Sequence, residues 1–193
     1  MVKAQALSLQ ACKIGFLSFS SLNLSIYNRH DLLQHLRQQF QTDWWGHHGI
    51  AHWARVRANG LMLAGQTGAN RHVMELLSFF HDSRGFNEHV DDGHGACGAS
   101  LARRFKGRYF DASDEEMDLL HFACVHHSDG MAHGNATMLT SWDADRLDLG
   151  CVGITPNAKY LGTEVARTAA VMAKAIRRAQ AWCDVYDARH DSN

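Results

Sequence analysis

Residues 76–84 read Leu-Leu-Ser-Phe-Phe-His-Asp-Ser-Arg. The apolar run ends on a histidine–aspartate doublet, His81-Asp82. Neighbouring residues on a helix diverge by about 100°, so two adjacent polar side chains rarely share one contact with solvent. At a helix end, both can turn toward one ion between helices. Asp82 also opposes the helix dipole if it stands at a C-terminus, so a cation nearby is expected. The doublet therefore predicts a helix end that carries metal ligands.

The composition predicts one soluble, helical domain. The chain has 193 residues, of which 46% are hydrophobic and 20% charged, with a single proline. This length is enough for one well-buried core. A net charge of −1 gives no field that attracts polyanions, so we expect neither a nucleic-acid groove nor an anionic membrane surface as partner. The sequence has no run approaching the roughly 20 apolar residues of a membrane span.

The histidine and cysteine contents point to metal binding in a reducing compartment. The 14 histidines are the unusual number, because histidine is the commonest metal ligand. The cysteines are odd in number and form no C-x-x-C pair, which is not the pattern of a disulfide framework. They are Cys12, Cys97, Cys124, Cys151 and Cys183. Scattered cysteines in apolar surroundings are typical of buried thiols, so we expect a cytoplasmic protein.

Apolar residues recur with the helical period through most of the chain. The pattern predicts helices at about 28–40, 47–64, 70–81, 93–105, 113–127, 138–149 and 164–186. Ser113 and Glu116 form a capping box at the start of one of them. Residues 83–92 are expected to form a loop over the site, and 150–162 a connection. Residues 1–27 are interpreted as an N-terminal extension, so the predicted fold is an all-α single domain over 28–190.

Two histidines lie four residues apart, so His48 and His52 can share one helix face. The spacing is that of the H-E-x-x-H motif, but Gly49 stands where a zinc protease has its glutamate. A metalloprotease is therefore not expected.

Three short motifs occur in a defined order. They are His52-x-x-Arg55-Val56, His81-Asp82 and Ala144-Asp145-Arg146-Leu147. In this order, over about residues 47–150, the sequence resembles the HD-domain superfamily of metal-dependent phosphohydrolases. The resemblance implies an HD-type helical bundle in which His52, His81, Asp82 and Asp145 bind the first metal. His94 and the pair His126-His127 resemble the additional histidines of the binuclear branch, so His94 and His126 are predicted ligands of a second ion.

Two comparisons with branches of the HD superfamily bear on the class of substrate. The Gly-Tyr-Pro element of the cyclic-di-nucleotide branch does not follow Asp129-Gly130, which disfavours those substrates. The nucleotidase branch often has a glutamate soon after the doublet, and Glu88 is the only candidate nearby.

The chemistry of the predicted ligands fits hydrolysis. Mixed imidazole and carboxylate ligands suit a divalent transition metal such as Mn, Fe, Co, Ni or Zn, as one ion or two. Such an ion makes hydroxide available at neutral pH, and hydroxide can attack phosphorus. Arg84 is predicted to contact the phosphate, because its planar fork matches phosphate oxygens. His126 or His127 is predicted to be the general acid if it does not bind metal.

Several readings stay open. His81 can simply cap its helix, Asp145 can pair with Arg146 at the surface, and Arg55 is expected to pair with a buried carboxylate. The leading function is hydrolysis of a phosphate mono- or diester, with a small phosphorylated substrate such as a nucleotide as partner. The alternatives are an HD-fold di-iron oxygenase, which uses the same ligand order, and a non-catalytic metal- or nucleotide-binding module. The sequence does not predict the oligomeric state.

Overall fold

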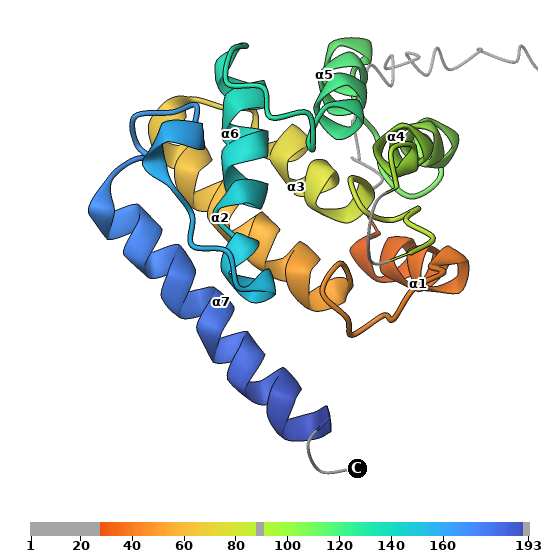
Figure 1. Ribbon diagram of the computed structural model, residues 1–193. Coiled ribbons are helices and arrows are strands. Elements are labelled where there is room, and N and C mark those ends of the chain that lie inside the picture. The colour runs from red at the N-terminus through yellow and green to blue at the C-terminus, as the bar shows by residue number, and fades with distance from the viewer. Residues whose placement is uncertain (1–27, 88–90, 191–193) are drawn as a thin grey trace, which may run out of the picture.

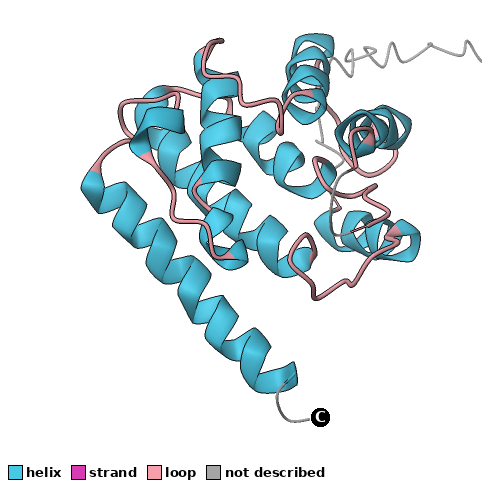
Figure 2. Cartoon of the chain, viewed as in Figure 1, coloured by secondary structure: helices cyan, strands magenta, loops and turns pink. Residues whose placement is uncertain are grey.

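The computed structural model of the chain describes residues 28–87 and 91–190. Within these ranges it has seven α-helices and two short 3₁₀ helices. Figure 2 shows that helices and loops make up the described chain, without strands. The α-helices are α1 (Arg29–Gln39), α2 (Ile50–Thr67), α3 (Arg71–Phe80), α4 (His94–Phe105), α5 (Asp114–Val125), α6 (Ala136–Arg146) and α7 (Ala169–His190). The 3₁₀ helices are η1 (Leu149–Val152) and η2 (Ala158–Tyr160). The predicted N-terminal extension, 1–27, lies outside the described residues.

Short polar side chains begin most of the helices. Asn28, Asn70 and Asn135 each accept hydrogen bonds from backbone N–H groups in the first turn of α1, α3 and α6. The predicted capping box is confirmed at α5. The Glu116 N–H donates to Ser113 Oγ at 3.1 Å, and the Ser113 N–H donates to Glu116 Oε2 at 2.9 Å. These caps satisfy donors that the helix itself leaves free.

Helix α2 is central. It packs against α3 on one side and α6 on another, while α4 and α5 pack together and against α3 (Figure 1). Large side chains buried completely at these contacts include Trp53, Phe80, Phe110 and Trp142. Small residues in α4 also allow close packing. A Cβ at Gly98 would collide with the carbonyl oxygen of Phe80, so glycine lets α4 approach the end of α3.

The last helix begins later than predicted, at Ala169 rather than near residue 164. Residues 163–168 form turns and bends instead, and within them the Thr163 hydroxyl accepts from the Ala166 N–H at 3.2 Å. A second hydroxyl, that of Thr168, accepts from the Val171 N–H at 3.4 Å and opens the helix. Helix α7 packs on η1 and α2, and its C-terminal part projects beyond the other helices (Figure 1). Among the described helices, none combines the length and apolar character needed to cross a bilayer.

Candidate metal centre

Six polar side chains meet at a place where two helices begin and three others end. His52 is in the first turn of α2, His81 caps the C-terminus of α3, and Asp82 follows it. The others lie at the start of α4, just after α5 and near the end of α6, and are His94, His127 and Asp145 respectively. Helix ends bring side chains from distant parts of the chain to one place while the apolar helix faces form the core. The predicted helix end at His81-Asp82 is therefore the middle of a cluster.

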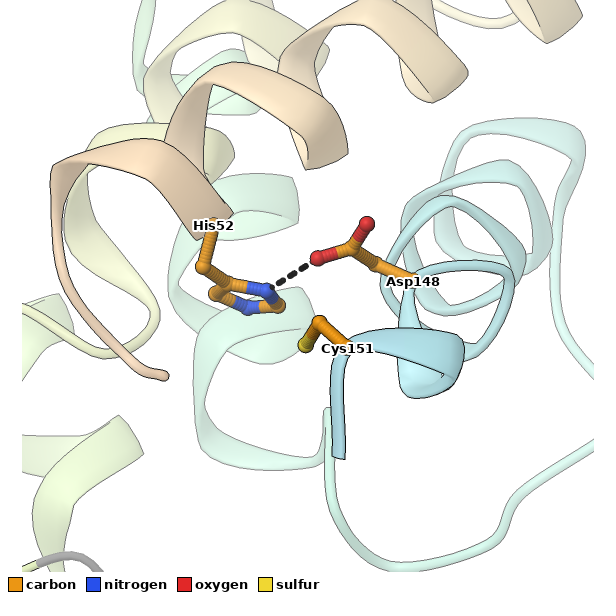
Figure 3. A group of neighbouring side chains, drawn as sticks. All are labelled: His52, Asp148 and Cys151. Carbon is orange, nitrogen blue, oxygen red and sulfur yellow. Dashed lines mark hydrogen bonds and ion pairs between the residues drawn. The ribbon is translucent and has the colours of Figure 1, made fainter. Parts of the chain in front are cut away.

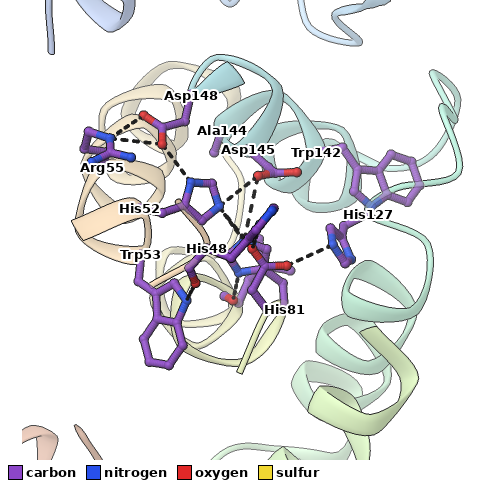
Figure 4. A network of polar contacts seen from close by, with 12 residues as sticks. His48, His52, Trp53, Arg55, His81, His127, Trp142, Ala144, Asp145 and Asp148 are labelled. Atoms are coloured by element: carbon purple, nitrogen blue, oxygen red, sulfur yellow. Dashed lines mark hydrogen bonds and ion pairs between the residues drawn. The ribbon is translucent and has the colours of Figure 1, made fainter. Parts of the chain in front are cut away.

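The first group of donors contains two imidazoles and two carboxylates. His52 Nε2 lies 3.0 Å from His81 Nε2, 3.4 Å from Asp82 Oδ2 and 3.3 Å from Asp145 Oδ1. His81 Nε2 lies 3.4 Å from Asp82 Oδ2 and 3.7 Å from Asp145 Oδ1. Figure 4 shows His52, His81 and Asp145 converging from α2, the end of α3 and α6.

A second group uses the other oxygen of the same aspartate. Asp82 Oδ1 lies 3.3 Å from His94 Nε2 and 3.3 Å from His127 Nε2. The two imidazole nitrogens are 2.9 Å apart. Asp82 therefore joins two adjoining donor groups, one through each oxygen.

The opposite nitrogen of every histidine in the cluster has its own acceptor. The acceptors of the four Nδ1 atoms are Asp148 Oδ2 for His52 at 2.7 Å, the Leu77 carbonyl for His81 at 3.1 Å, the Cys124 carbonyl for His127 at 2.7 Å and the Asp91 carbonyl for His94. A hydrogen bond donated by Nδ1 leaves Nε2 with a lone pair. Bare lone pairs about 3 Å apart repel one another unless a cation, either a proton or a metal ion, lies between them. The hydrogen bonds of the four Nδ1 atoms thus prepare all four Nε2 atoms as ligands.

The spacing fits a metal ion. With metal–ligand bonds of about 2.1 Å, ligand atoms stand about 3.0 Å apart at 90° and about 3.4 Å apart at a tetrahedral angle. The observed donor separations run from 2.9 to 3.7 Å. Nitrogen and carboxylate donors in these proportions suit divalent transition metals. The residues of both groups could therefore hold such ions.

The electrostatics of the cluster point the same way. Burial would raise the pKa of Asp82, but its interactions with His81, His127, His48 and His52 hold that pKa well below its usual value. Burial lowers the pKa of His81 to about 4, so its imidazole is neutral at pH 7. Burial acts likewise on His127, but Asp82 outweighs it and raises the pKa to about 9. Two ionised carboxylates thus draw positive charge into the cluster, and a metal can take the place of the proton.

A buried chain of contacts orients His52. Asp148, whose side chain is only 1% exposed, receives two hydrogen bonds from Arg55 Nε, at 2.8 and 3.0 Å. The Arg55 guanidinium stacks on the ring of Trp182 in α7, with Cζ 4.4 Å from the ring centroid. The pairing of Arg55 with a buried carboxylate was predicted. Through these contacts, α7 supports the first donor group.

Cys151, in η1, lies beside His52 and Asp148 (Figure 3). With His52 and Asp148 it forms a further group of donors close enough to hold an ion. However, His52 Nδ1 is already hydrogen-bonded to Asp148 Oδ2, at 2.7 Å, and His52 Nε2 faces the first donor group. We therefore assign Asp148 to orienting His52. Each of the four cysteines in the described part of the chain is a free thiol.

The cluster lies in a cavity of about 390 Å³. Besides ligand candidates, its walls include His47, His48, Arg146, Leu149, Cys151 and Val152. His48 Nδ1 is 3.1 Å from Asp82 Oδ2, and 42% of this side chain is exposed. His48 therefore stands between the donors and solvent.

Two sequence-based assignments need correction. His126 is not in the cluster, because its Nδ1 bonds to Asp129 Oδ2 at 2.6 Å and its ring packs on Phe122. Its neighbour His127 occupies the place predicted for it. Arg84 lines none of the cavities described here, since its Nη1 donates to the Gln39 carbonyl at 2.9 Å. Glu88 lies outside the described residues.

Asp148 and the cavity wall formed by residues 149–161 were not predicted from the sequence. The signal for Asp148 was present in part, because Arg55 was expected to need a buried carboxylate. Asp143 has a structural role: its two oxygens accept from the Gly162 N–H at 2.6 Å, the Thr163 N–H at 2.8 Å and the Thr163 hydroxyl at 2.7 Å.

Comparison with known proteins supports the fold. No family model and no curated protein matches the sequence. The chain is similar to a solved structure described as a predicted HD superfamily hydrolase from an uncultured Thermotogales bacterium. The TM-score is 0.57 and the identity 22%, over 86% of this chain and 92% of that chain. The chain therefore has the HD-domain fold, as predicted, and it carries a histidine–aspartate cluster able to hold metal.

Proposed function

We propose that this protein is a metal-dependent phosphohydrolase of the HD type, which cleaves a phosphate mono- or diester. One observation carries the proposal. Four Nε2 atoms, each with its Nδ1 held by an acceptor, converge with Asp82 and Asp145 into two adjoining donor groups in an open cavity. A small phosphorylated substrate is the partner that this arrangement suits.

Bound divalent ions supply water with a pKa lowered from 15.7 to about 7 and positive charge next to the phosphoryl oxygens. The chain supplies the rest. Asp82 ties the two groups together, and Asp148 holds His52 in the tautomer that ligation requires.

In this proposal, two residues of the cavity wall act on the substrate directly. His48 faces the cavity beside Asp82 and is placed to give a proton to the leaving oxygen. Arg146 takes the role first given to Arg84, because it lines the cavity directly after Asp145. Its guanidinium matches phosphate oxygens in shape and charge.

Metal analysis combined with a screen of phosphatase and phosphodiesterase substrates tests the proposal. We expect protein stripped with a chelator to release no phosphate or alcohol, and activity to return with a transition metal. His48→Ala should lower kcat, whereas His30→Ala, a change in exposed α1, should leave it unaltered. Undiminished hydrolysis by fully stripped protein, or no hydrolysis by metal-loaded protein, would refute the proposal.

A di-iron oxygenase is the second candidate. It is favoured by the donor order His52, His81-Asp82, His94, His127 and Asp145, all of which lie in the cluster. Bound iron with substrate-dependent oxygen consumption would identify this function. Metal binding with neither oxygen consumption nor phosphoester hydrolysis would indicate the third alternative, a non-catalytic module.

A further inference from the structure

A second cavity adjoins the metal cavity. Its volume is about 230 Å³, and it shares three lining residues with the first: Gly130, Arg146 and Leu149. The other residues of its lining are Ile154, Thr155, Pro156, Asn157, Tyr160 and Leu161. A ligand held at the donor cluster can therefore extend past Arg146 into this second space.

The walls of the second cavity are mostly apolar. Its lining includes no acidic side chain. Two large hydrophobic side chains are unusually exposed there, Ile154 at 54% and Tyr160 at 60%. Large apolar side chains that gather in a concave site are typical of ligand-binding surfaces.

The position of this wall is fixed by the helix that also carries a metal-ligand candidate. Asp143, in α6, accepts three hydrogen bonds from Gly162 and Thr163, at the end of the wall segment. Asp145 is two residues further along the same helix. The distance between the donor cluster and the second cavity is therefore set by α6.

Arg146 stands where the two cavities meet. Its Nη1 donates to the Tyr160 carbonyl at 3.0 Å, which anchors the side chain to the wall. Its Nη2 is buried and has no hydrogen-bond partner in the described structure. A buried guanidinium nitrogen without an acceptor is costly, and an oxygen of a bound phosphoester would supply one.

We propose that the second cavity binds the leaving group of the substrate, and that the substrate is a phosphoester whose alcohol carries a flat, apolar or aromatic group. This rests on the proposed function. In the reaction, water loses one proton to solvent as its oxygen bonds to phosphorus, and the phosphorus–oxygen ester bond breaks. The leaving oxygen takes a proton from His48, which regains one from solvent. Arg146 contacts the phosphoryl group at the junction. Small polar alcohols fit this apolar lining poorly.

Non-hydrolysable phosphonates test the assignment by binding alone. We would measure the affinity of Mn²⁺-loaded protein for methylphosphonate and for 2-naphthylmethylphosphonate by calorimetry. The naphthyl compound should bind at least about tenfold more tightly, because its ring is buried in the second cavity. Ile154→Ser and Tyr160→Ala should each remove most of this preference and leave the affinity for methylphosphonate unchanged.

Val185→Ser is the matched control. Val185 is 50% exposed, similar to Ile154, but lies on α7 and lines neither cavity. The preference should survive in this variant. Equal affinity of wild-type protein for the two phosphonates, or an equal loss in all three variants, would overturn the proposal.

The outcomes also separate the two proposals. Hydrolysis without a naphthyl preference would remove the leaving-group site and leave the phosphohydrolase standing. A naphthyl preference that Ile154→Ser abolishes, without turnover of any phosphoester, would support the site and refute the hydrolase. Failure of metal-loaded protein to bind either phosphonate would refute both.

Discussion

His126 and His127 are adjacent in the sequence, and only the second reaches the donor cluster. We expect His127→Ala to reduce the number of bound transition-metal ions from two to one, because the second group then keeps only Asp82 and His94. His126→Ala should leave two ions, since this ring bonds to Asp129. Metal content of the purified variants checks the pair. Loss of an ion from the His126 variant would contradict the placement.

Asp148 acts on the metal through His52. Asp148→Asn should weaken metal binding by about 10- to 100-fold, the usual cost of removing a partner that orients a ligand. The number of sites should stay the same, because the variant retains every ligand candidate. Competition with a fluorescent chelator measures the affinity. Asp118→Asn, at an aspartate whose side chain is 80% exposed, is the control. Equal affinities of wild type and Asp148→Asn would exclude the orienting role.

At the scale of single residues, the sequence predicted which residues form the donor cluster better than it predicted where each side chain points. The motif order indicated His52, His81, Asp82, His94 and Asp145, and the structure brings them together. The sequence could not distinguish His126 from His127, because both follow the end of α5. The backbone of the last turn decides which ring faces the cluster. Arg84 follows the doublet directly, yet its side chain turns away toward α1. Sequence proximity to a site does not fix the side-chain direction.

Helices α3 and α4 approach closely only because position 98 is glycine. Gly98→Ala should destabilise the protein by roughly 1–3 kcal/mol, the usual range for overpacking, since the new Cβ meets the carbonyl of Phe80. Gly65→Ala is the matched control, because Gly65 is inside α2 and has open space around it. There alanine should stabilise by about 0.5–1 kcal/mol through its better helix propensity. Urea denaturation measures both, and equal effects would contradict the packing argument.

The cap of α5 should make stability depend on pH. Burial raises the pKa of Glu116, but the Ser113 N–H, the Asn70 amide and His72 outweigh it, so the pKa is lower than usual. A group with a lowered pKa stabilises the fold above its unfolded pKa, about 4.3 for glutamate, and loses this effect as the pH falls through its folded pKa. Glu116→Gln should therefore be less stable than wild type at pH 7.

The comparison at low pH completes this test. The difference in the free energy of unfolding between wild type and Glu116→Gln should shrink as the pH falls below about 4. Urea titrations at pH 7 and pH 3 measure it. A difference that stays constant would show that the charge of Glu116 does not stabilise the cap.

The elements themselves were largely predictable, because asparagine and serine caps and the apolar period mark them. The structure of the connection after α6 was not predictable from the sequence. Residues 150–162 contain no helical period, yet they form part of η1, η2 and the wall of a cavity. Their positions depend on long-range bonds to Asp143 in α6, which no local pattern contains.

The whole molecule should be stabilised by metal. An ion that binds only the folded chain, at 100 times its Kd, adds about 2.7 kcal/mol to the free energy of unfolding. For a chain of this size, this corresponds to a rise in Tm of roughly 5–10 °C. Thermal unfolding of chelator-treated and metal-loaded protein checks the shift. The Asp82→Ala variant should gain little from metal, and an equal gain would place the ion elsewhere.

The order of the donors along the chain has a consequence for biosynthesis. All donors of the group formed by Asp82, His94 and His127 precede α6, whereas the other group waits for Asp145 and for Asp148. At 5–20 residues per second, the ribosome needs about 1–4 s to pass from residue 127 to residue 148. Within this interval a nascent chain offers one complete group and one open group. A single short segment, 145–148, then supplies both the missing ligand candidate, Asp145, and the carboxylate of Asp148 that orients His52.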